Sequence, residues 1–142
     1  MNIVGFTGTR EKTTIEQQKE FTRLLQNINI SEFHHGDCTG WDELAHNIIR
    51  NKIKFNNHVK IVIHPPSYNK YRAYCEGDLI LNCKPYLDRN KDIVDACDLL
   101  VACTKGLAYV HSGTWSTISY ARKKNKLIYI IYPNGHIHVE NL

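Results

Sequence analysis

Two short turns rich in glycine and hydroxyl side chains carry the residues best suited to hold a phosphate. The first is Thr7–Arg10, which reads TGTR, and the second is Ser112–Thr114, which reads SGT. Glycine lets the backbone approach an anion closely, and a helix N-terminus adds partial positive charge. Arg10 adds a guanidinium that can hold phosphate through two parallel hydrogen bonds. Ser and Thr are also ordinary helix caps, so it is the pair of turns together that predicts phosphate binding.

Two carboxylates and one arginine stand in positions that could complete such a site. Asp37 follows an apolar segment, and we expect it to accept hydrogen bonds from ribose hydroxyls. Asp42 could do the same, although stabilising a helix terminus is the favoured interpretation. Arg89, followed by Asn90, lies near the start of a predicted helix, where a cation opposes the helix dipole. This position therefore indicates a ligand contact or a salt bridge.

The segment 67–85 combines aromatic and basic side chains without a helical or strand period. Its sequence includes Tyr68, Lys70, Tyr71, Arg72 and Tyr74. Alternating rings and cations are suited to stacking a nucleic-acid base, whereas surface tyrosines that pack the segment onto the protein are equally consistent. An aperiodic segment of this length is typical of a binding loop or lid.

The cysteines and histidines do not match a metal-binding pattern. The five cysteines are odd in number and form no CxxC, and the N-terminus does not resemble a secretory signal, so we expect reduced thiols and a cytoplasmic protein. His34, His35 and Cys38 match no common zinc spacing, and a strand would point the two histidines to opposite faces. We expect no metal and no cofactor. The chain also contains neither a Walker A motif nor GxGxxG.

Length and charge narrow the classes of partner. A chain of 142 residues fits one domain, 1–142, and no apolar run approaches the roughly 20 residues of a membrane helix. The formal net charge of +4 suits an anionic ligand but falls short of the basic stripe of a dedicated nucleic-acid binder. An anionic small molecule is therefore favoured over duplex DNA.

Apolar runs and amphipathic segments alternate along the chain. Continuously apolar strands separated by helices predict a parallel sheet with helices on both faces, a three-layer α/β Rossmann-like fold. We expect about five strands in the order 3-2-1-4-5, with a short additional edge strand at 137–139. The predicted strands are 1–6, 32–35, 59–63, 99–103 and 127–132, and the clearest helices are 14–28, 88–97 and 112–125.

Five sequence blocks in order resemble small proteins of the SLOG superfamily, which includes DprA/Smf proteins and the "lonely guy" phosphoribohydrolases. The blocks are Gly5–Arg10, His34–Asp42, His64–Pro66, Arg89–Val94 and Ser112–Thr117. The resemblance extends from Asn2 to about Pro133. It implies a Rossmann-like domain that binds a nucleotide or nucleotide derivative, with phosphate at Ser112–Thr114, and it implies a homo-oligomer.

One departure from the phosphoribohydrolases bears on catalysis. Their PGGxGTxxE block ends in a glutamate that takes part in cleaving the N-glycosidic bond, and Thr117 stands in its place here. Threonine can neither stabilise an oxocarbenium ion by charge nor act as a base near neutral pH. Arg89 falls in the place of an arginine that these enzymes carry. Asp37 and Arg89 are the catalytic candidates, and the sequence favours binding over hydrolysis.

The sequence thus predicts a sensor or sequestering protein for a nucleotide or nucleotide-derived signalling molecule. The alternatives are a nucleoside-monophosphate N-glycosidic hydrolase or transferase, and a DprA-like single-stranded nucleic-acid binder. The predicted ligand-binding residues are Gly8, Thr9, Arg10, Gly36, Asp37, Arg72, Arg89, Asn90, Ser112, Gly113, Thr114 and Thr117.

Overall fold

Strands and helices alternate along the chain, as the apolar runs predict. The computed structural model describes residues 1–11, 13–108 and 112–142. Within these ranges, no helix is long and apolar enough to cross a membrane. The elements are β1 (Asn2–Gly8), α1 (Ile15–Gln26), β2 (Ile30–His35), α2 (Trp41–Asn51), β3 (Lys60–Ile63), the 3-10 helix η1 (Asn69–Tyr71), β4 (Leu79–Ile80), α3 (Tyr86–Ala96), β5 (Leu99–Cys103), α4 (Gly113–Lys123), β6 (Leu127–Ile131) and β7 (Ile137–Glu140).

The strands form one sheet in the order β4-β3-β2-β1-β5-β6-β7. Its five central strands are parallel and confirm the predicted order, while β7 pairs antiparallel with β6 at one edge. The described sheet has seven strands rather than about five, because β4 adds a parallel strand beside β3. β4 comprises two residues of the 67–85 segment, which is too short to produce a hydrophobic period.

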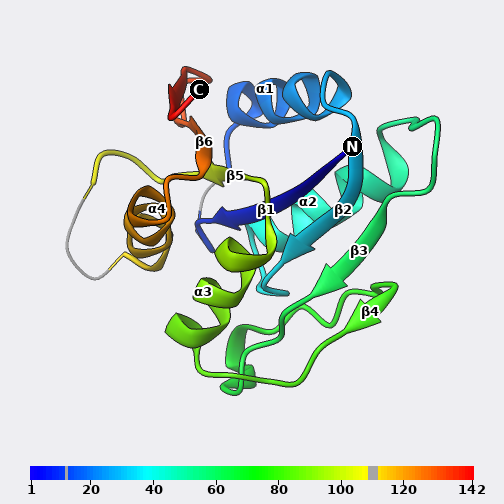
Figure 1. Ribbon diagram of the computed structural model, residues 1–142, viewed down its shortest axis with the longest axis vertical. Helices are drawn as coiled ribbons and strands as arrows, with labels where there is room; N and C mark the ends of the chain where they lie inside the picture. The colour runs from blue at the N-terminus through cyan, green and yellow to red at the C-terminus, as the bar shows by residue number, and fades with distance from the viewer. Residues whose placement is uncertain (12, 109–111) are drawn as a thin grey trace.

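Helices cover both faces of the sheet and enclose two separate hydrophobic cores (Figure 1). Phe21 of α1 and Trp41 of α2 are fully buried in one core, together with Phe6 of β1. Val94 of α3 and Ile118 of α4 belong to the core on the other face. The strands are apolar on both sides because each side faces a helical layer.

β1 lies where the direction of chain progression across the sheet reverses. β2 and β3 continue to one side of β1, and β5 and β6 continue to the other. α3 lies so close to β1 that a Cβ atom at Gly5 would be only 3.1 Å from Cγ2 of Ile93 in this helix. In open parallel sheets, ligands bind beyond the carboxyl ends of the strands at such a reversal point. This rule predicts a ligand site around the carboxyl ends of β1, β2 and β5.

Candidate functional site

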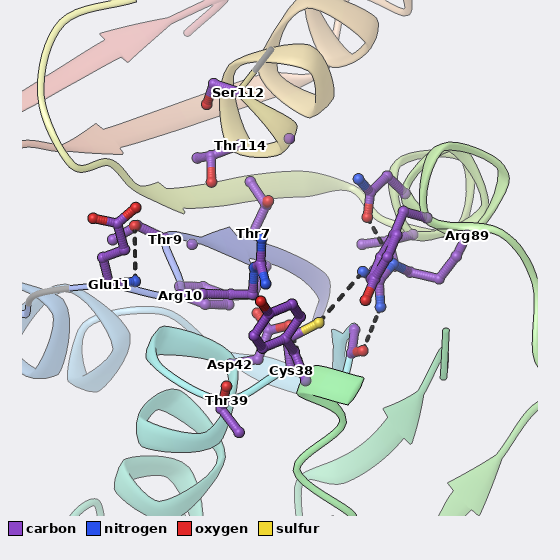
Figure 2. A pocket seen from close by; sticks show the side chains of 18 of the residues that line it. Thr7, Thr9, Arg10, Glu11, Cys38, Thr39, Asp42, Arg89, Ser112 and Thr114 are labelled. Carbon is purple, nitrogen blue, oxygen red and sulfur yellow. Dashed lines mark hydrogen bonds between the residues drawn. The ribbon is translucent and has the colours of Figure 1, made fainter. Parts of the chain in front are cut away.

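The loops that follow β1, β2 and β5 surround a cavity of about 640 Å³ (Figure 2). Ligand pockets for small molecules have volumes of roughly 300–1,000 Å³, so a nucleotide is of suitable size. Figure 2 shows Thr9, Arg89 and Thr114 reaching this space from three different parts of the chain. Of the ligand-binding residues predicted from the sequence, those that line the cavity are Gly8, Thr9, Arg10, Gly36, Arg89, Asn90, Ser112, Gly113 and Thr114.

A second hollow, of about 800 Å³, lies at the amino ends of β2 and β3. Residues 26–30 and 52–57 line it, and they include no carboxylate and no arginine. The cavity at the carboxyl ends of the strands combines hydroxyls, carboxylates and cations. Position in the fold and chemistry of the lining, rather than volume, therefore identify the candidate site.

The loop after β1 is fixed tightly between β5 and α2. The Thr9 backbone N–H donates to the Cys103 carbonyl at 3.0 Å, and the Trp41 N–H donates to the Thr9 carbonyl at 3.0 Å. Gly8 is required here, because a Cβ atom would lie 2.5 Å from Trp41 Cβ. Arg10 is exposed, and its guanidinium lies 3.9 Å from the centroid of the Tyr71 ring. The loop thus holds a cation at the mouth of the cavity.

The N-terminus of α4 forms the opposite wall. The Ser112 hydroxyl caps the helix by accepting from the Trp115 N–H at 3.2 Å. A Cβ atom at Gly113 would meet no atom within 4 Å, so space is open in front of the first turn. The Thr117 hydroxyl donates to the Gly113 carbonyl at 2.8 Å, and Thr117 does not line the cavity. Ser112 and Gly113 therefore border the cavity at the start of α4, while the Thr117 hydroxyl is engaged within the helix.

Arg89 is a buried cation that joins three elements. Its Nη1 donates to the Gly36 carbonyl and, at 3.1 Å, to the His64 carbonyl, which lie beyond the ends of β2 and β3. Its Nε donates to Asn90 Oδ1 at 2.7 Å. Its Nη2 lies 3.7 Å from Cys38 Sγ (Figure 2). Arg89 therefore donates its hydrogen bonds to neutral protein groups, and its own positive charge remains at the cavity wall.

Asp42 lies in the first turn of α2 and lines the cavity. Only 7% of its surface is exposed, and its carboxylate accepts from the Cys38 N–H at 3.1 Å. Burial raises the pKa of Asp42 to about 6, although the Arg89 charge opposes the rise. A carboxyl group with this pKa can both accept and donate a proton near neutral pH.

Asp37 and Arg72 do not line this cavity, although the sequence placed both among the ligand-binding residues. The Asp37 side chain is fully buried and accepts from Arg72 Nε at 3.0 Å and from the Cys75 N–H at 2.8 Å. Its backbone has a φ of 59°, a left-handed conformation that Asp tolerates better than most residues. This conformation turns the carboxylate toward the 72–75 backbone. The described contacts make Asp37 an anchor of that backbone.

The 67–85 segment is attached to the loop after β2 by backbone hydrogen bonds. The Thr39 N–H donates to the Tyr71 carbonyl at 2.8 Å, and the Ala73 N–H donates to the Asp37 carbonyl at 2.7 Å. Tyr71 lines the cavity. The segment therefore supplies part of the cavity wall, and its behaviour as a lid stays a prediction.

A carboxylate accompanies the second exposed cation of the cavity. Lys105 Nζ and Glu11 Oε2 lie 2.8 Å apart, and both residues line the cavity. Hydrogen bonding and charge attraction from Lys105 lower the pKa of Glu11. An anionic ligand that approached Lys105 would compete with Glu11 for its ammonium group.

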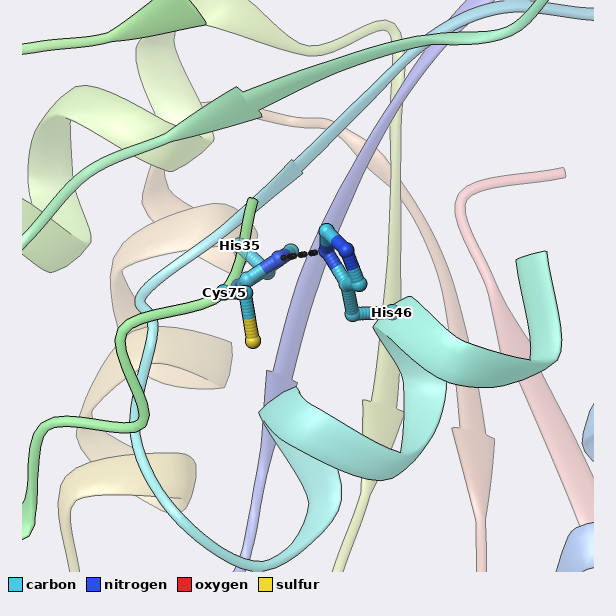
Figure 3. Close-up of side chains that lie close together, drawn as sticks. All are labelled: His35, His46 and Cys75. Atoms are coloured by element: carbon cyan, nitrogen blue, oxygen red, sulfur yellow. Dashed lines mark hydrogen bonds between the residues drawn. The ribbon is translucent and has the colours of Figure 1, made fainter. Parts of the chain in front are cut away.

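A separate cluster comprises His35, His46 and Cys75, whose ligand-type atoms lie within 4.8 Å of one another (Figure 3). The Asp37 N–H donates to His35 Nδ1 at 2.9 Å, so neutral His35 carries its proton on Nε2. That nitrogen lies 3.0 Å from His46 Nδ1 and donates to it. A metal-binding histidine normally donates through its second nitrogen, whereas His35 Nδ1 accepts. The hydrogen bonds therefore describe a neutral histidine pair that a metal ion would disrupt.

Sequence reasoning missed several cavity residues, two of which lie at the start of α3. Tyr86 and Leu87 line the cavity, but the sequence pattern placed the start of this helix at residue 88. The helix begins two residues earlier, directly after Pro85. Proline is common at helix starts, so Pro85 was the available signal.

Comparisons with known proteins show similarity at the level of the fold. No protein-family model matches the chain, and no curated protein matches it. A molybdenum cofactor binding protein from the phototrophic bacterium Rippkaea orientalis is 22% identical, with a TM-score of 0.68, over 92% of this chain and 76% of that protein. DNA processing protein A from Helicobacter pylori, described with its single-stranded DNA binding mode, is 19% identical, with a TM-score of 0.63, over 90% of this chain. The match spans 64% of that second protein.

Proposed function

We propose that this protein binds a nucleotide or nucleotide-derived signalling molecule in the cavity of about 640 Å³, as a sensor or sequestering protein. The observation that carries the proposal is the convergence of the two phosphate-suited turns, Thr7–Arg10 and Ser112–Thr114, on one cavity. The similar structures are described as binding a cofactor and single-stranded DNA, which supports a binding role. The five-block resemblance to SLOG proteins supports a nucleotide as the ligand.

The phosphate is proposed to lie before the first turn of α4. The positive end of the α4 dipole and the open space at Gly113 suit an anion. Arg10 at the cavity mouth provides a second contact, and the buried Arg89 charge adds attraction without a direct bond.

Calorimetric titration with nucleoside monophosphates, cyclic nucleotides and ADP-ribose derivatives tests the proposal. We expect saturable binding of at least one compound. If no compound produces heat or raises the melting temperature of folded protein, the proposed function is wrong.

A matched pair of glycine variants locates the binding site. Gly113 and Gly106 both face open space, with no atom within 4 Å of an added Cβ, but only Gly113 lines the cavity. Gly113→Val should therefore fold normally and lose binding at least tenfold, roughly the 1.4 kcal/mol expected when a side chain enters a phosphate position. Gly106→Val should bind like the wild type. Equal affinity of the two variants would contradict the proposed phosphate position.

Hydrolysis of the N-glycosidic bond is a second candidate function, favoured by Asp42. Its carboxyl group lines the cavity and has a pKa of about 6. Protonated Asp42 would donate its proton to the leaving base as the C1′–N bond breaks. Water would then add to C1′ and return a proton to Asp42, which gives free base and ribose 5-phosphate. Chromatographic detection of free base tests this step, and no free base should appear with Asp42→Asn. If a nucleotide binds and stays uncleaved, hydrolysis is ruled out and only binding remains.

Single-stranded nucleic acid is tested in the same panel with an oligonucleotide. Arg72, expected to contact it, is paired with Asp37, and its guanidinium lies 4.5 Å from the Tyr74 ring centroid. The affinity for the phosphate backbone of an oligonucleotide should fall steeply as the salt concentration rises. An affinity that does not change with salt would therefore exclude this mode of binding.

A further inference from the structure

One face of α3 forms a wall of the cavity. Tyr86, Leu87, Asn90 and Ile93 all line the cavity, and their spacing places them on one side of the helix. The Tyr86 hydroxyl is engaged outside the helix, donating to the Tyr68 carbonyl at 3.2 Å. Apart from Arg89, which also lines the cavity from this helix, the wall is aromatic and aliphatic, with the Asn90 amide between its apolar residues.

The hydrogen bond from Arg89 fixes which end of the Asn90 amide remains for a ligand. Arg89 Nε can only donate, so the amide atom 2.7 Å away must be the oxygen, Oδ1. Because Arg89 Nε can only donate, this one hydrogen bond is enough to assign the orientation of the Asn90 amide. Asn90 therefore offers its NH₂ group, a donor, to whatever lies against the wall.

The wall is suited to the base rather than to the phosphate. The proposed phosphate position lies at the start of α4 and at the loop after β1, where hydroxyls and Arg10 gather. Pockets for small molecules are mostly apolar, with a few polar groups that set orientation and specificity. An aromatic base against Tyr86 and Ile93 would place an edge atom near the Asn90 amide.

Resting on the proposed nucleotide-binding function, we propose that Asn90 is a specificity-determining residue that reads the carbonyl oxygen at C6 of a purine or at C4 of a pyrimidine. The ligand class is then a nucleotide of hypoxanthine, guanine or uracil. Recognition of adenine by an amide uses one acceptor and one donor together. Arg89 already uses one of the two lone pairs of the Asn90 oxygen, whereas a carbonyl on the base needs only the NH₂ donor. Arg89 acts here as a positioning residue for Asn90.

Two pairs of nucleotides isolate this contact by calorimetry. IMP and AMP differ in a carbonyl against an amino group, and UMP and CMP provide the same contrast in pyrimidines. We expect the wild type to bind the carbonyl member of at least one pair about tenfold more tightly, within the roughly 1–3 kcal/mol of a base contact.

Asn90→Asp removes the NH₂ donors while keeping the shape and an acceptor for Arg89. Its added negative charge weakens both members of a pair alike, so the ratio of their affinities is the informative quantity. The ratio should fall to about one or invert. Asn82→Asp makes the same charge change outside this cavity and should keep the wild-type ratio.

The outcomes separate this inference from the function on which it rests. Wild-type protein that binds AMP and CMP as tightly as IMP and UMP would overturn the inference and leave nucleotide binding intact. An unchanged ratio in Asn90→Asp would overturn it as well. Absence of binding to every nucleotide would instead overturn the proposed function and, with it, this inference.

Discussion

At the scale of single residues, Arg89 has a structural role that mutation can measure. Arg89→Met keeps much of the aliphatic stem but leaves the Gly36 and His64 carbonyls without their donor. We expect the free energy of unfolding to fall by about 2–4 kcal/mol, because buried acceptors lose their partners. Urea denaturation measures the change. Arg23→Met at an exposed position should stay within about 0.5 kcal/mol, and a similarly small loss for Arg89→Met would contradict the assignment.

His64 makes stability depend on pH. Burial, with a contribution from the neighbouring His34, lowers the pKa of His64 to about 4, whereas an unfolded histidine titrates near 6.5. The unfolded chain therefore takes up this proton first as the pH falls. The His64 contribution is fully present above about pH 6.5 and is lost progressively toward pH 4.

Comparison with His64→Gln isolates this contribution from that of Asp42. The raised pKa of Asp42, about 6, has the opposite effect, since the folded protein takes up that proton first. Urea denaturation between pH 7 and pH 4 should show a shallower loss of stability for His64→Gln than for the wild type. Parallel profiles would show that His64 does not titrate as described.

The histidine pair predicts a specific response to metal. Zinc binding at His35, His46 and Cys75 would have to displace the proton between the two histidines and the bond from the Asp37 N–H. We therefore expect excess Zn²⁺ to change the melting temperature by less than about 1 °C, because only a ligand of the folded state raises it. A larger rise that His46→Ala abolishes would instead identify a metal site.

The roles of Asp37 and Asp42 show why the sequence could not complete the site. Both residues belong to the block His34–Asp42, and both are polar candidates at the end of a strand. The directions in which the two side chains point depend on the left-handed φ of Asp37 and on the residue at which α2 begins. Turn geometry of this kind leaves little trace in residue type, so the sequence favoured Asp37 for the ligand while the cavity lining includes Asp42.

At the scale of elements, the 67–85 segment should depend on one carboxylate. Asp37→Ala removes the acceptor of the Cys75 N–H, a bond of 2.8 Å, and the partner of Arg72. We expect amide hydrogen exchange at Cys75 to accelerate at least tenfold, which corresponds to about 1.4 kcal/mol of local opening. Asp95→Ala, which removes an exposed partner of Tyr120, should leave this exchange unchanged. Unchanged exchange in Asp37→Ala would argue against the anchor.

The regular elements could be predicted, whereas this segment could not. Apolar runs identify the five central strands, and the rules for parallel sheets give their order. Residues 67–85 are held by long-range contacts to Thr39 and Asp37 rather than by a repeating pattern. No local period exists there for sequence reasoning to detect.

At the scale of the whole molecule, a bound nucleotide should stabilise the fold as a unit. The cavity takes its walls from α2 on one face of the sheet and from α3 and α4 on the other. A ligand at 100 times its Kd adds about 2.7 kcal/mol. At about 2–4 °C per kcal/mol, the melting temperature should rise by on the order of 8 °C. Differential scanning calorimetry measures the rise, and Gly113→Val, with an affinity at least tenfold lower, should show about half of that rise or less at the same ligand concentration.

The sheet also has an unequal pair of edges. β7 forms one edge, whereas β4 at the other consists of Leu79 and Ile80, which are 42% and 52% exposed. The next residue, Leu81, is also exposed. An open strand edge with apolar side chains is a template on which another chain can add a strand. In concentrated solutions the protein should therefore aggregate first through residues 79–81. Ile80→Lys should improve solubility and leave the cavity unchanged, because Ile80 does not line it.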